Sequence, residues 1–591
     1  MRSVSGSRGA AFLAALALLA GCGGGAGSGS LGSTIPKQTN GATGSVRFSI
    51  VVPQKTATSG RSPAYVSPAT QSMTVTVYQG ANNLGTATVG LTASSTGCTS
   101  SLASTTCTLT ISSLNAGSYT GSITTYDGPN GTGNALSTAQ NVAFTVTSNQ
   151  STLVPLTLSG IPTAIQVLSA GTNAVDVLAQ DADGNFIVGA GAPTFTATAS
   201  SGPAVVTVTQ PTASQPNRIS FVQASPVVYG TESFGVSASF PAGESNACTQ
   251  SGAVCSLSSA VTAEAGAPMA AIANGYTNSV LGYTLPLTSA TQAPAVSIAL
   301  PSAHVLTMDS SGNLFAASSS SPATVLEIPA PYTAAKVTNS LGGRYSRQIA
   351  VAPNGDLALA NGGSIGGSLY APPYTAAPIG LVNGLSSPFG VAFDASNNLY
   401  FANYSLSQVA ILAPPYTGTP VTVSTTSAPY GLSVSGGTLF VGESSDVDVF
   451  SLPLTGASTP IATLSNGIDR SFRTAVDASG NLWVANAFGG ANLEGSIEEF
   501  TKPFSTGEAP AVTISMPIGG TSTSYYPLGI AFDSAGDLYV VNTYGGTNRG
   551  GLLEFSPPIT SSSTPKYAIE TSNLSSTYDI VITPPTFLVT P

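Results

Sequence analysis

Charged residues are rare in this 591-residue chain. They make up only 7% of it, against about 25% in ordinary soluble domains. The chain holds 15 Lys and Arg and 25 Asp and Glu, and its basic residues form no cluster. The sequence therefore argues against a nucleic-acid partner, because phosphate binding needs concentrated positive charge. Beyond Met1–Ala20 no apolar run reaches about 18 residues, so no transmembrane helix is predicted there.

Histidine is nearly absent, and the one example is His304. A Ser-His-Asp triad would have to use it, and no Gly-x-Ser-x-Gly motif stands in a strand–turn–helix context. A lone histidine at the beginning of a strand is expected to be structural. The sequence therefore predicts no catalytic residue, metal ligand or cofactor.

Cysteine is also scarce, with five residues in the chain. Setting Cys22 aside leaves two local pairs, which predict the disulfides Cys98–Cys107 and Cys248–Cys255 in an oxidising compartment. Metal binding by these pairs is the alternative. It is disfavoured because neither pair has Cys-x-x-Cys spacing and no histidine is near.

One short phrase recurs between residues 269 and 591: an apolar strand, then Asp-x-x-Gly-Asn-Leu, an aromatic residue and Ala-Asn. Its copies are MDSSGNLFAAS (308–318), APNGDLALAN (352–361), FDASNNLYFAN (393–403), VSGGTLFVGE (434–443), VDASGNLWVAN (476–486) and FDSAGDLYVVN (532–542). Their leucines recur every ~40–56 residues, a period that indicates propeller blades when it is written in β-type residues.

A second marker, Pro followed by an apolar residue and Thr or Ser, counts the blades independently. It occurs at Pro286, Pro331, Pro373, Pro415, Pro453, Pro503 and Pro558. The segment 270–300 reads as three strands of a blade without its first strand, and 576–584 resembles that missing strand. We therefore predict seven blades, the last closed by both ends of the repeat region. Six blades with loose ends is the alternative.

The segments GVAFDASNNLYFAN (390–403) and GIAFDSAGDLYVVN (529–542) resemble the repeats of NHL-type and related lyase- or lactonase-like propellers. The resemblance covers roughly half of the chain, 266–591, and implies the fold. It says little about activity, because this repeat serves binding modules and enzymes alike. The lactonase-like members hold a central metal, whereas the first strands here carry Thr, Ala, Val and Ile where such ligands would project.

Two further all-β domains are predicted before the propeller. Alternating β-type strands at 45–52, 73–80, 107–114, 117–127, 141–147 and 151–158 indicate an Ig-like β-sandwich over 44–160. A second Ig-like β-sandwich is predicted over 161–265. Its segment VLAQDADGNFI (177–187) resembles bacterial Ig-like and invasin-type repeats, which act as spacers.

The N-terminal segment carries Arg2 and Arg8, a short apolar run and Leu19-Ala20-Gly21-Cys22. This pattern looks like a bacterial lipobox, which implies a signal peptide over 1–21, cleavage before Cys22 and acylation of that cysteine. The glycine- and serine-rich segment within 22–43 fits a flexible tether. The resemblance implies a lipid anchor in the membrane, at the bacterial outer membrane or cell surface. An ordinary secretory signal is the alternative.

Two sets of repeated polar residues invite a functional interpretation. Residues that close the second strand of each blade could form a polar collar, and they are Asn274, Ser318, Asn361, Asn403, Glu443, Asn486 and Asn542. Capping of the next loop is the favoured interpretation, because a residue needed for chemistry would not recur in nearly every blade. The turn aspartates Asp309, Asp394, Asp477 and Asp533 are likewise interpreted as hairpin residues, since each turn offers too few oxygens for Ca²⁺.

Irregular residues in the loops that enter the first strands are better ligand candidates, because the repeat does not dictate them. Arginine and tyrosine together suit a carboxylate, a carbohydrate or a protein ligand. The candidates are Arg344, Arg347, Arg470, Arg473, Tyr430 and Tyr526. Solvated loop residues are the alternative. The sequence thus favours a non-catalytic binding or adhesion module, with a metal-dependent lyase or lactonase as the second hypothesis.

Overall fold

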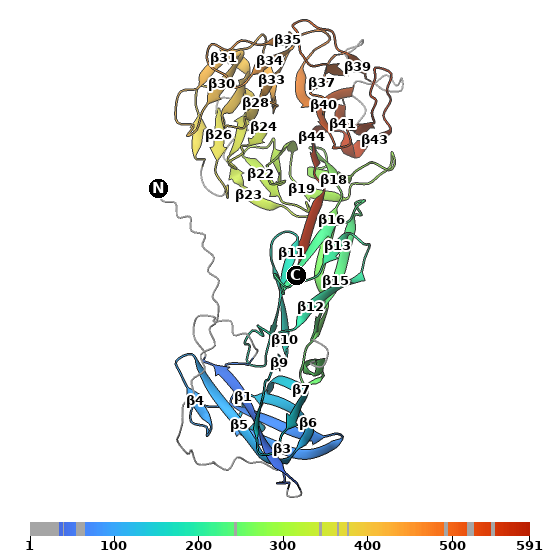
Figure 1. Ribbon diagram of the computed structural model, residues 1–591. Helices are drawn as coiled ribbons and strands as arrows, with labels where there is room; N and C mark the ends of the chain where they lie inside the picture. The colour runs from blue at the N-terminus through green and yellow to red at the C-terminus, as the bar shows by residue number, and fades with distance from the viewer. Residues whose placement is uncertain are drawn as a thin grey trace.

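The computed structural model describes residues 35–38, 41–54, 66–240, 245–341, 346–362, 366–374, 378–489, 495–516, 525–544 and 550–591. Figure 1 shows three parts in a row: two modules built of strands and a broad head of small sheets. The expected all-β class is confirmed. No described helix is long and apolar enough to cross a membrane. Residues 1–21, Cys22 and Arg344 lie outside the described residues.

The first module consists of two sheets around one core. Its strands are β1 (Thr43–Pro53), β2 (Ser72–Gln79), β3 (Asn82–Gly90), β4 (Cys98–Ser100), β5 (Ser104–Asn115), β6 (Gly117–Tyr126), β7 (Ala135–Val146), β8 (Ser151–Val154) and β9 (Ser159–Gly160), with a 3₁₀ turn η1 (Pro129–Gly131). One sheet has the order β4-β5-β1-β8 and the other β3-β2-β6-β7-β9. Alternate residues such as Phe48, Val75 and Leu109 are buried between them, as the two-residue period of a strand requires.

The second module also pairs two sheets around one core. Its strands are β10 (Ala164–Ser169), β11 (Ala174–Gln180), β12 (Thr194–Ser201), β13 (Val206–Thr209), β14 (Arg218–Gln223), β15 (Gly230–Ser239) and β16 (Ser256–Gly266), with a 3₁₀ turn η2 (Ser245–Thr249).

Both disulfides expected from the spacing are present. Cys98–Cys107 joins β4 to β5, and Cys248–Cys255 joins η2 to the residue before β16.

The head contains six four-stranded antiparallel sheets made of consecutive strands. They are β20 (Ala303–Met308), β21 (Leu314–Ser318), β22 (Ala323–Ile328) and β23 (Lys336–Leu341); β24 (Ser346–Val351), β25 (Leu357–Asn361), β26 (Gly367–Tyr370) and β27 (Gly380–Val382); β28 (Pro388–Phe393), β29 (Leu399–Asn403), β30 (Gln408–Leu412) and β31 (Val421–Ser424); β32 (Pro429–Ser435), β33 (Thr438–Glu443), β34 (Val447–Ser451) and β35 (Ala462–Leu464); β36 (Ser471–Val476), β37 (Leu482–Asn486), β38 (Ser496–Phe500) and β39 (Val512–Ser515); and β40 (Tyr525–Phe532), β41 (Leu538–Tyr544), β42 (Gly550–Phe555) and β43 (Tyr567–Thr571). Short 3₁₀ turns η3 (Tyr404–Leu406) and η4 (Ser572–Leu574) lie between strands.

A seventh four-stranded sheet of the head joins distant parts of the chain. It has the order β19-β18-β17-β44 and contains β17 (Met269–Asn274), β18 (Ser279–Thr284), β19 (Val296–Ala299) and β44 (Thr577–Thr583). The strand expected at 576–584 thus pairs with the segment 270–300, as the sequence predicted. Ile272 of β17 lies opposite Ile580 of β44, and both are buried. Because of this pairing, β17 has a partner strand on each side and is not an exposed sheet edge.

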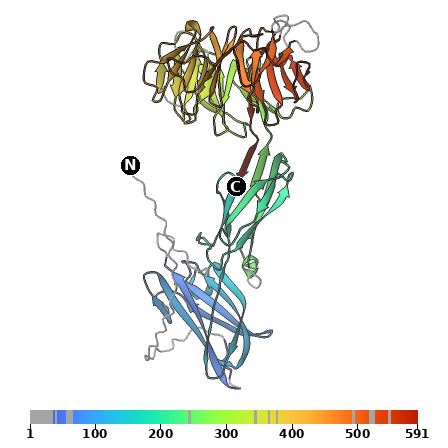
Figure 2. The ribbon, with the colours of Figure 1, turned by 45° about the horizontal axis from the view of Figure 1, so that its top comes forward.

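The last strand, β45 (Thr586–Thr590), belongs to the second module and not to the head. It pairs with β16 and completes a sheet of order β12-β15-β16-β45. This return of the chain was not predicted, since all of 266–591 was expected to form the propeller. Two chain segments therefore join the head to the second module, since Gly266 lies opposite Thr586 and Met269 opposite Thr583. Figure 2 shows both segments running between the two parts.

The two repeated motifs have separate structural roles. Each of the seven Pro motifs lies in the connection between the third and fourth strands of a sheet. Where the apolar residue is tyrosine, its hydroxyl donates to a backbone carbonyl in the turn between the first and second strands: Tyr332 to Gly312 at 2.8 Å, and Tyr374 to Gly355 at 2.7 Å. The motif therefore ties together two loops at the same end of the sheet.

Candidate functional site

The first strands of all seven sheets surround one cavity in the head. Residues of β20, β24, β28, β32, β36, β40 and β44 line it, and its volume is about 280 Å³. The lining is mostly aliphatic side chains and backbone, with Thr307, Ser433 and Thr474 among the polar groups. We call this cavity the channel.

Three long polar side chains enter the channel from equivalent positions. Each lies one residue after a β-bulge in its first strand: Gln348 in β24, Arg473 in β36 and Asp579 in β44. The equivalent position in β28, β32 and β40 is glycine. A side chain on Gly431 would lie 2.2 Å from the carbonyl oxygen of Phe472, so the backbones approach closely there. Departures from the glycine of the repeat therefore identify the residues that fill the channel.

Gln348 crosses from its own strand to two others. Its amide nitrogen donates to the carbonyl oxygen of Leu432 at 3.0 Å, and its amide oxygen accepts from the N–H groups of Val391 and Leu432 at 3.2 and 3.3 Å. One side chain thus links β24, β28 and β32, so Gln348 is a structural residue of the channel.

Arg473 was expected to face a ligand, but it turns inward and forms an ion pair. Its Nε and Nη2 donate to the two carboxylate oxygens of Asp579, both at 3.2 Å, and its side chain is only 18% exposed. Asp579 also accepts from the N–H of Leu306 at 3.0 Å. The pair therefore links β36, β44 and β20 across the channel, and Arg473 is unavailable to a ligand in this arrangement.

A β-bulge occurs at the same place in every first strand, just before the channel position. The pairing register shifts there in all seven sheets. Bulges re-aim side chains, and the residues concerned form a set that we call the bulge ring: His304, Arg347, Phe389, Tyr430, Phe472, Leu528 and Tyr578. Six of the seven are aromatic, histidine or arginine, although the repeat does not require any of these types.

Neighbouring members of the bulge ring contact one another. The ring centroids of Phe389 and Tyr430 are 5.2 Å apart, and those of Tyr430 and Phe472 are 5.0 Å apart. Tyr404, from the loop after β29, packs on both Phe389 and Tyr430 at 4.8 and 5.1 Å. Burial, followed by the hydrogen bond with Tyr404, raises the pKa of Tyr430 to about 12, so its hydroxyl remains protonated at neutral pH. An aromatic arc therefore spans three neighbouring sheets.

Two exposed arginines stack on rings of this face. The guanidinium carbon of Arg347 lies 4.6 Å from the centroid of Phe389, and that of Arg470 lies 4.4 Å from the centroid of Phe488. Tyr526 packs against Phe488 at 4.7 Å. Arg470 has a φ of 62°, a conformation that costs a non-glycine residue about 1 kcal/mol or more. Of the six predicted ligand residues, Arg347, Arg470, Tyr430 and Tyr526 thus lie at the entry ends of first strands, and Arg344 lies outside the described residues.

His304 belongs to the bulge ring and packs on Tyr578, with 4.5 Å between ring centroids. Burial, followed by the charges of Arg473 and Arg347, lowers its pKa to about 4. Its imidazole is therefore neutral at neutral pH. Nδ1 has no hydrogen-bond partner, and no carboxylate is bonded to the ring to orient it as a base.

The residues of the proposed polar collar are buried, and several of them bond to nearby loops. Asn403 accepts from the N–H of Ser386 at 2.6 Å, and Asn486 accepts from the N–H of Asp469 at 2.7 Å. Glu443 accepts from the N–H of Ser427. These three residues therefore cap loops, as the favoured interpretation predicted. Asn361 instead bonds to Ser368 of the next strand, and the side chain of Asn542 has no hydrogen-bond partner among the described residues.

The turn aspartates are also explained by local bonding. Oδ1 of Asp394 accepts from the N–H groups of Ser396 and Asn398 at 2.9 and 2.8 Å, and Oδ2 accepts from the hydroxyl of Tyr400 at 2.8 Å. Asp309, Asp477 and Asp533 accept equivalent backbone bonds. Their carboxylates stabilise hairpins, as expected.

The face that carries the bulge ring points away from the second module. Residues such as Ser471, at the start of a first strand, pair with the last residue of the second strand, here Asn486. The segments from the second module enter at the other end of the strands, where Met269 opposes Thr583. The bulge ring is therefore on the distal face of the head.

Comparison with known proteins gives structural similarity only. No protein-family model matches the chain, and no curated protein matches it. A candidate 6-phosphogluconolactonase of Bacteroides fragilis aligns with 54% of this chain and 98% of its own, at 10% identity and a TM-score of 0.43. Virginiamycin B lyase of Staphylococcus aureus aligns with 44% and 86%, at 13% identity and a TM-score of 0.32. A nidogen/laminin complex aligns with 54% and 98%, at 12% identity and a TM-score of 0.33. Scores this low assign no activity, ligand or residue role to this chain.

Proposed function

We propose that the chain is a lipid-anchored binding protein whose head is a closed seven-bladed β-propeller and whose two preceding modules form an Ig-like stalk. The seven four-stranded sheets, the seven first strands around one channel and the pairing of β17 with β44 support the propeller. The resemblance of Leu19–Cys22 to a lipobox supports the anchor at the bacterial outer membrane or cell surface. An acylated Cys22 would hold the stalk, and the distal face would point away from the membrane.

The observation that carries the binding function is the bulge ring with its stacked arginines. Aromatic and arginine side chains contribute most of the free energy at protein interfaces, and here they are held on strands of a rigid scaffold. The guanidinium groups of Arg347 and Arg470 already cover the faces of Phe389 and Phe488. Less ring face is then open for stacking by a sugar, so we favour a protein ligand over a carbohydrate.

The channel argues against the alternative, a metal-dependent lyase or lactonase. Among the residues that line it, Asp579 is the one carboxylate, and it is bonded to Arg473. A metal site of that kind needs several converging ligands with open positions. The lining therefore favours binding, and the similarity to a lactonase and a lyase does not alter this choice.

The binding test uses the full-length chain and two matched variants. Partners captured from extracellular or cell-surface protein fractions would be identified and their affinity measured, with a glycan array run in parallel. Arg347→Ala combined with Arg470→Ala should weaken the interaction about 30-fold or more, the expected loss at an interface hot spot. Lys502→Ala removes an exposed charge at the opposite end of a sheet and should leave affinity unchanged. Equal affinity of all three proteins would move the site away from the distal face.

The anchor has a separate test. Metabolic labelling with a fatty-acid probe should mark the wild-type chain, and Cys22→Ser should abolish the label. Labelling that survives this substitution would refute acylation at Cys22 without affecting the binding proposal.

A further inference from the structure

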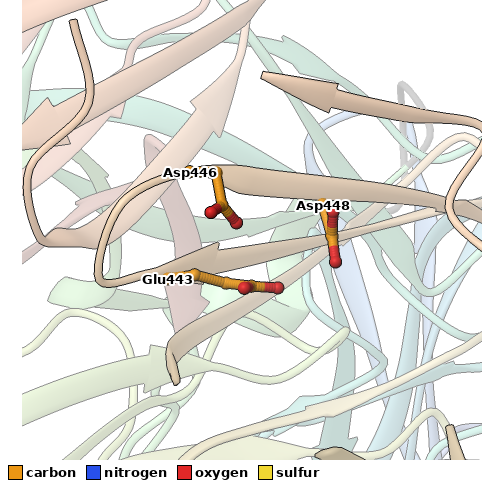
Figure 3. Close-up of side chains that lie close together, drawn as sticks. All are labelled: Glu443, Asp446 and Asp448. Atoms are coloured by element: carbon orange, nitrogen blue, oxygen red, sulfur yellow. The ribbon is translucent and has the colours of Figure 1, made fainter. Parts of the chain in front are cut away.

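Three buried carboxylates converge in the loop between β33 and β34, outside the channel. Glu443 ends β33, Asp446 lies in the turn, and Asp448 lies in β34. Their exposed fractions are 0%, 3% and 0%. Each offers an oxygen within 4.8 Å of those of the other two, and Figure 3 shows the side chains directed toward a common region. None of the three lines the channel.

Protein donors satisfy only part of this cluster. Asp448 accepts from the N–H of Thr426 at 2.8 Å and from the hydroxyls of Thr426 and Thr463 at 2.9 and 2.7 Å. One oxygen of Asp446 accepts from Ser445 at 2.9 Å, and one oxygen of Glu443 accepts from a backbone N–H. All of these donors are neutral, so they leave the negative charge of the cluster uncompensated.

Three buried oxygens near this point have no hydrogen-bond partner at all. They are Oε1 of Glu443, Oδ1 of Asp446 and the hydroxyl oxygen of Ser427, whose backbone N–H donates to Glu443. Within the described residues, no lysine or arginine forms an ion pair with any of the three carboxylates. Buried charges are normally paired or bind a metal, because desolvation without compensation is costly. The unpartnered oxygens therefore point to a missing cation.

We propose that Glu443, Asp446 and Asp448 bind one Ca²⁺ ion. The donors are all oxygen, which hard cations prefer. Ca–O distances are about 2.4 Å, so two oxygens that bind one Ca²⁺ lie at most about 5 Å apart. The oxygens of this cluster lie within 4.8 Å of one another, which is within reach of one such ion.

The hairpin that would hold the ion is bonded to the neighbouring sheet. The hydroxyl of Ser471, at the start of β36, donates to the carbonyl oxygens of Glu443 and Asp446 at 3.3 and 3.4 Å. Glu443 pairs with Pro429, the residue before Tyr430 of the bulge ring. Ca²⁺ would thus stabilise the loop beneath the distal face, whatever ligand that face binds.

The test is calcium titration of the full-length chain after removal of metal with EDTA. Calorimetry at pH 7 should show one Ca²⁺ bound per chain. Saturating Ca²⁺ should raise Tm by roughly 2–6 °C. Glu443→Gln should weaken binding at least 10-fold and abolish the rise in Tm. Asp446→Asn should likewise weaken Ca²⁺ binding and abolish the rise in Tm. It provides the test if Glu443→Gln fails to fold.

Glu498→Gln is the matched control. Glu498 is as buried as Glu443, but its two oxygens accept from the hydroxyls of Ser496 and Thr513 at 2.7 and 2.5 Å. This variant should bind Ca²⁺ as the wild type does. Three results would overturn the proposal: no stoichiometric Ca²⁺ binding by the wild type, wild-type affinity in Glu443→Gln, or tighter binding of Mg²⁺ than of Ca²⁺.

Discussion

The ion pair between Arg473 and Asp579 should contribute substantially to the stability of the head. Arg473 lies in β36 and Asp579 in β44, the strand that completes the seventh sheet, so the pair fastens this strand across the channel. Replacing Arg473 with Met keeps the aliphatic stem and removes the charge. The change leaves a carboxylate that is 7% exposed without its cation.

The size of the effect follows from what Asp579 retains. Removing one partner of a fully buried pair costs about 3–5 kcal/mol. Here Arg473 is 18% exposed, and Asp579 keeps the N–H groups of Leu306 and Ile580. We therefore expect Arg473→Met to lower the free energy of unfolding by about 2–3 kcal/mol. Combining it with Asp579→Asn should reveal a coupling of about 1–2 kcal/mol.

A single tryptophan makes the head separately measurable. Trp483 is the one tryptophan of the chain and lies buried in β37. Its fluorescence during urea unfolding reports on the head and not on the two modules before it. Lys502→Met is the control and should change stability by less than about 0.5 kcal/mol. If Arg473→Met were no more destabilising than Lys502→Met, the proposed fastening of β44 would be wrong.

Further predictions concern pH, chain closure and the first module. His304 has a folded pKa near 4, below its unfolded value of about 6.5. Its contribution to the free energy of unfolding is therefore full above pH 6.5 and is lost as the pH falls toward 4. Unfolding free energy should drop by about 1–2 kcal/mol more between pH 7 and 5 in the wild type than in His304→Gln, and equal slopes would contradict this. Deleting 577–591 removes β44 and β45 and should cause aggregation through the exposed edge of β17, visible by light scattering; a soluble, folded deletion would refute the closure. Replacing Cys98 and Cys107 with Ser should cost the first module about 2–3 kcal/mol, measured by calorimetry, because the closed loop is short.

Local patterns in the sequence were sufficient for the strands, turns and disulfides. The Asp-x-x-Gly phrase predicts a hairpin because its carboxylate bonds to N–H groups two and four residues further on, as Asp394 does. The seven copies of the Pro motif gave the number of sheets in the head, and the odd strand at 576–584 indicated where the two ends of the repeat region meet. These features depend on contacts between residues close in the sequence or on a motif that recurs along it, so they can be predicted from the sequence.

The candidate site was predicted only in part. Arg347, Arg470, Tyr430 and Tyr526 were singled out because they break the repeat, and they lie on one face. Arg473 broke the repeat too, but it is committed to Asp579, 106 residues away. The cluster of buried carboxylates was missed, although Glu443 stood out as a departure from the asparagines of its position.

What the tertiary structure alone decided is which distant residues meet. The sequence by itself determined the β-strands, their grouping in fours and the meeting of residues near 270 with those near 580. It could not determine that Arg473 enters the channel whereas Arg470 stays exposed. Arg470 lies before the strand with a φ of 62°, and the partner of Arg473 is 106 residues away. Nor could it place β45 beside β16, where Thr262 and Thr590 are 328 residues apart. Strand periodicity is local, whereas these pairings join residues that lie far apart in the sequence.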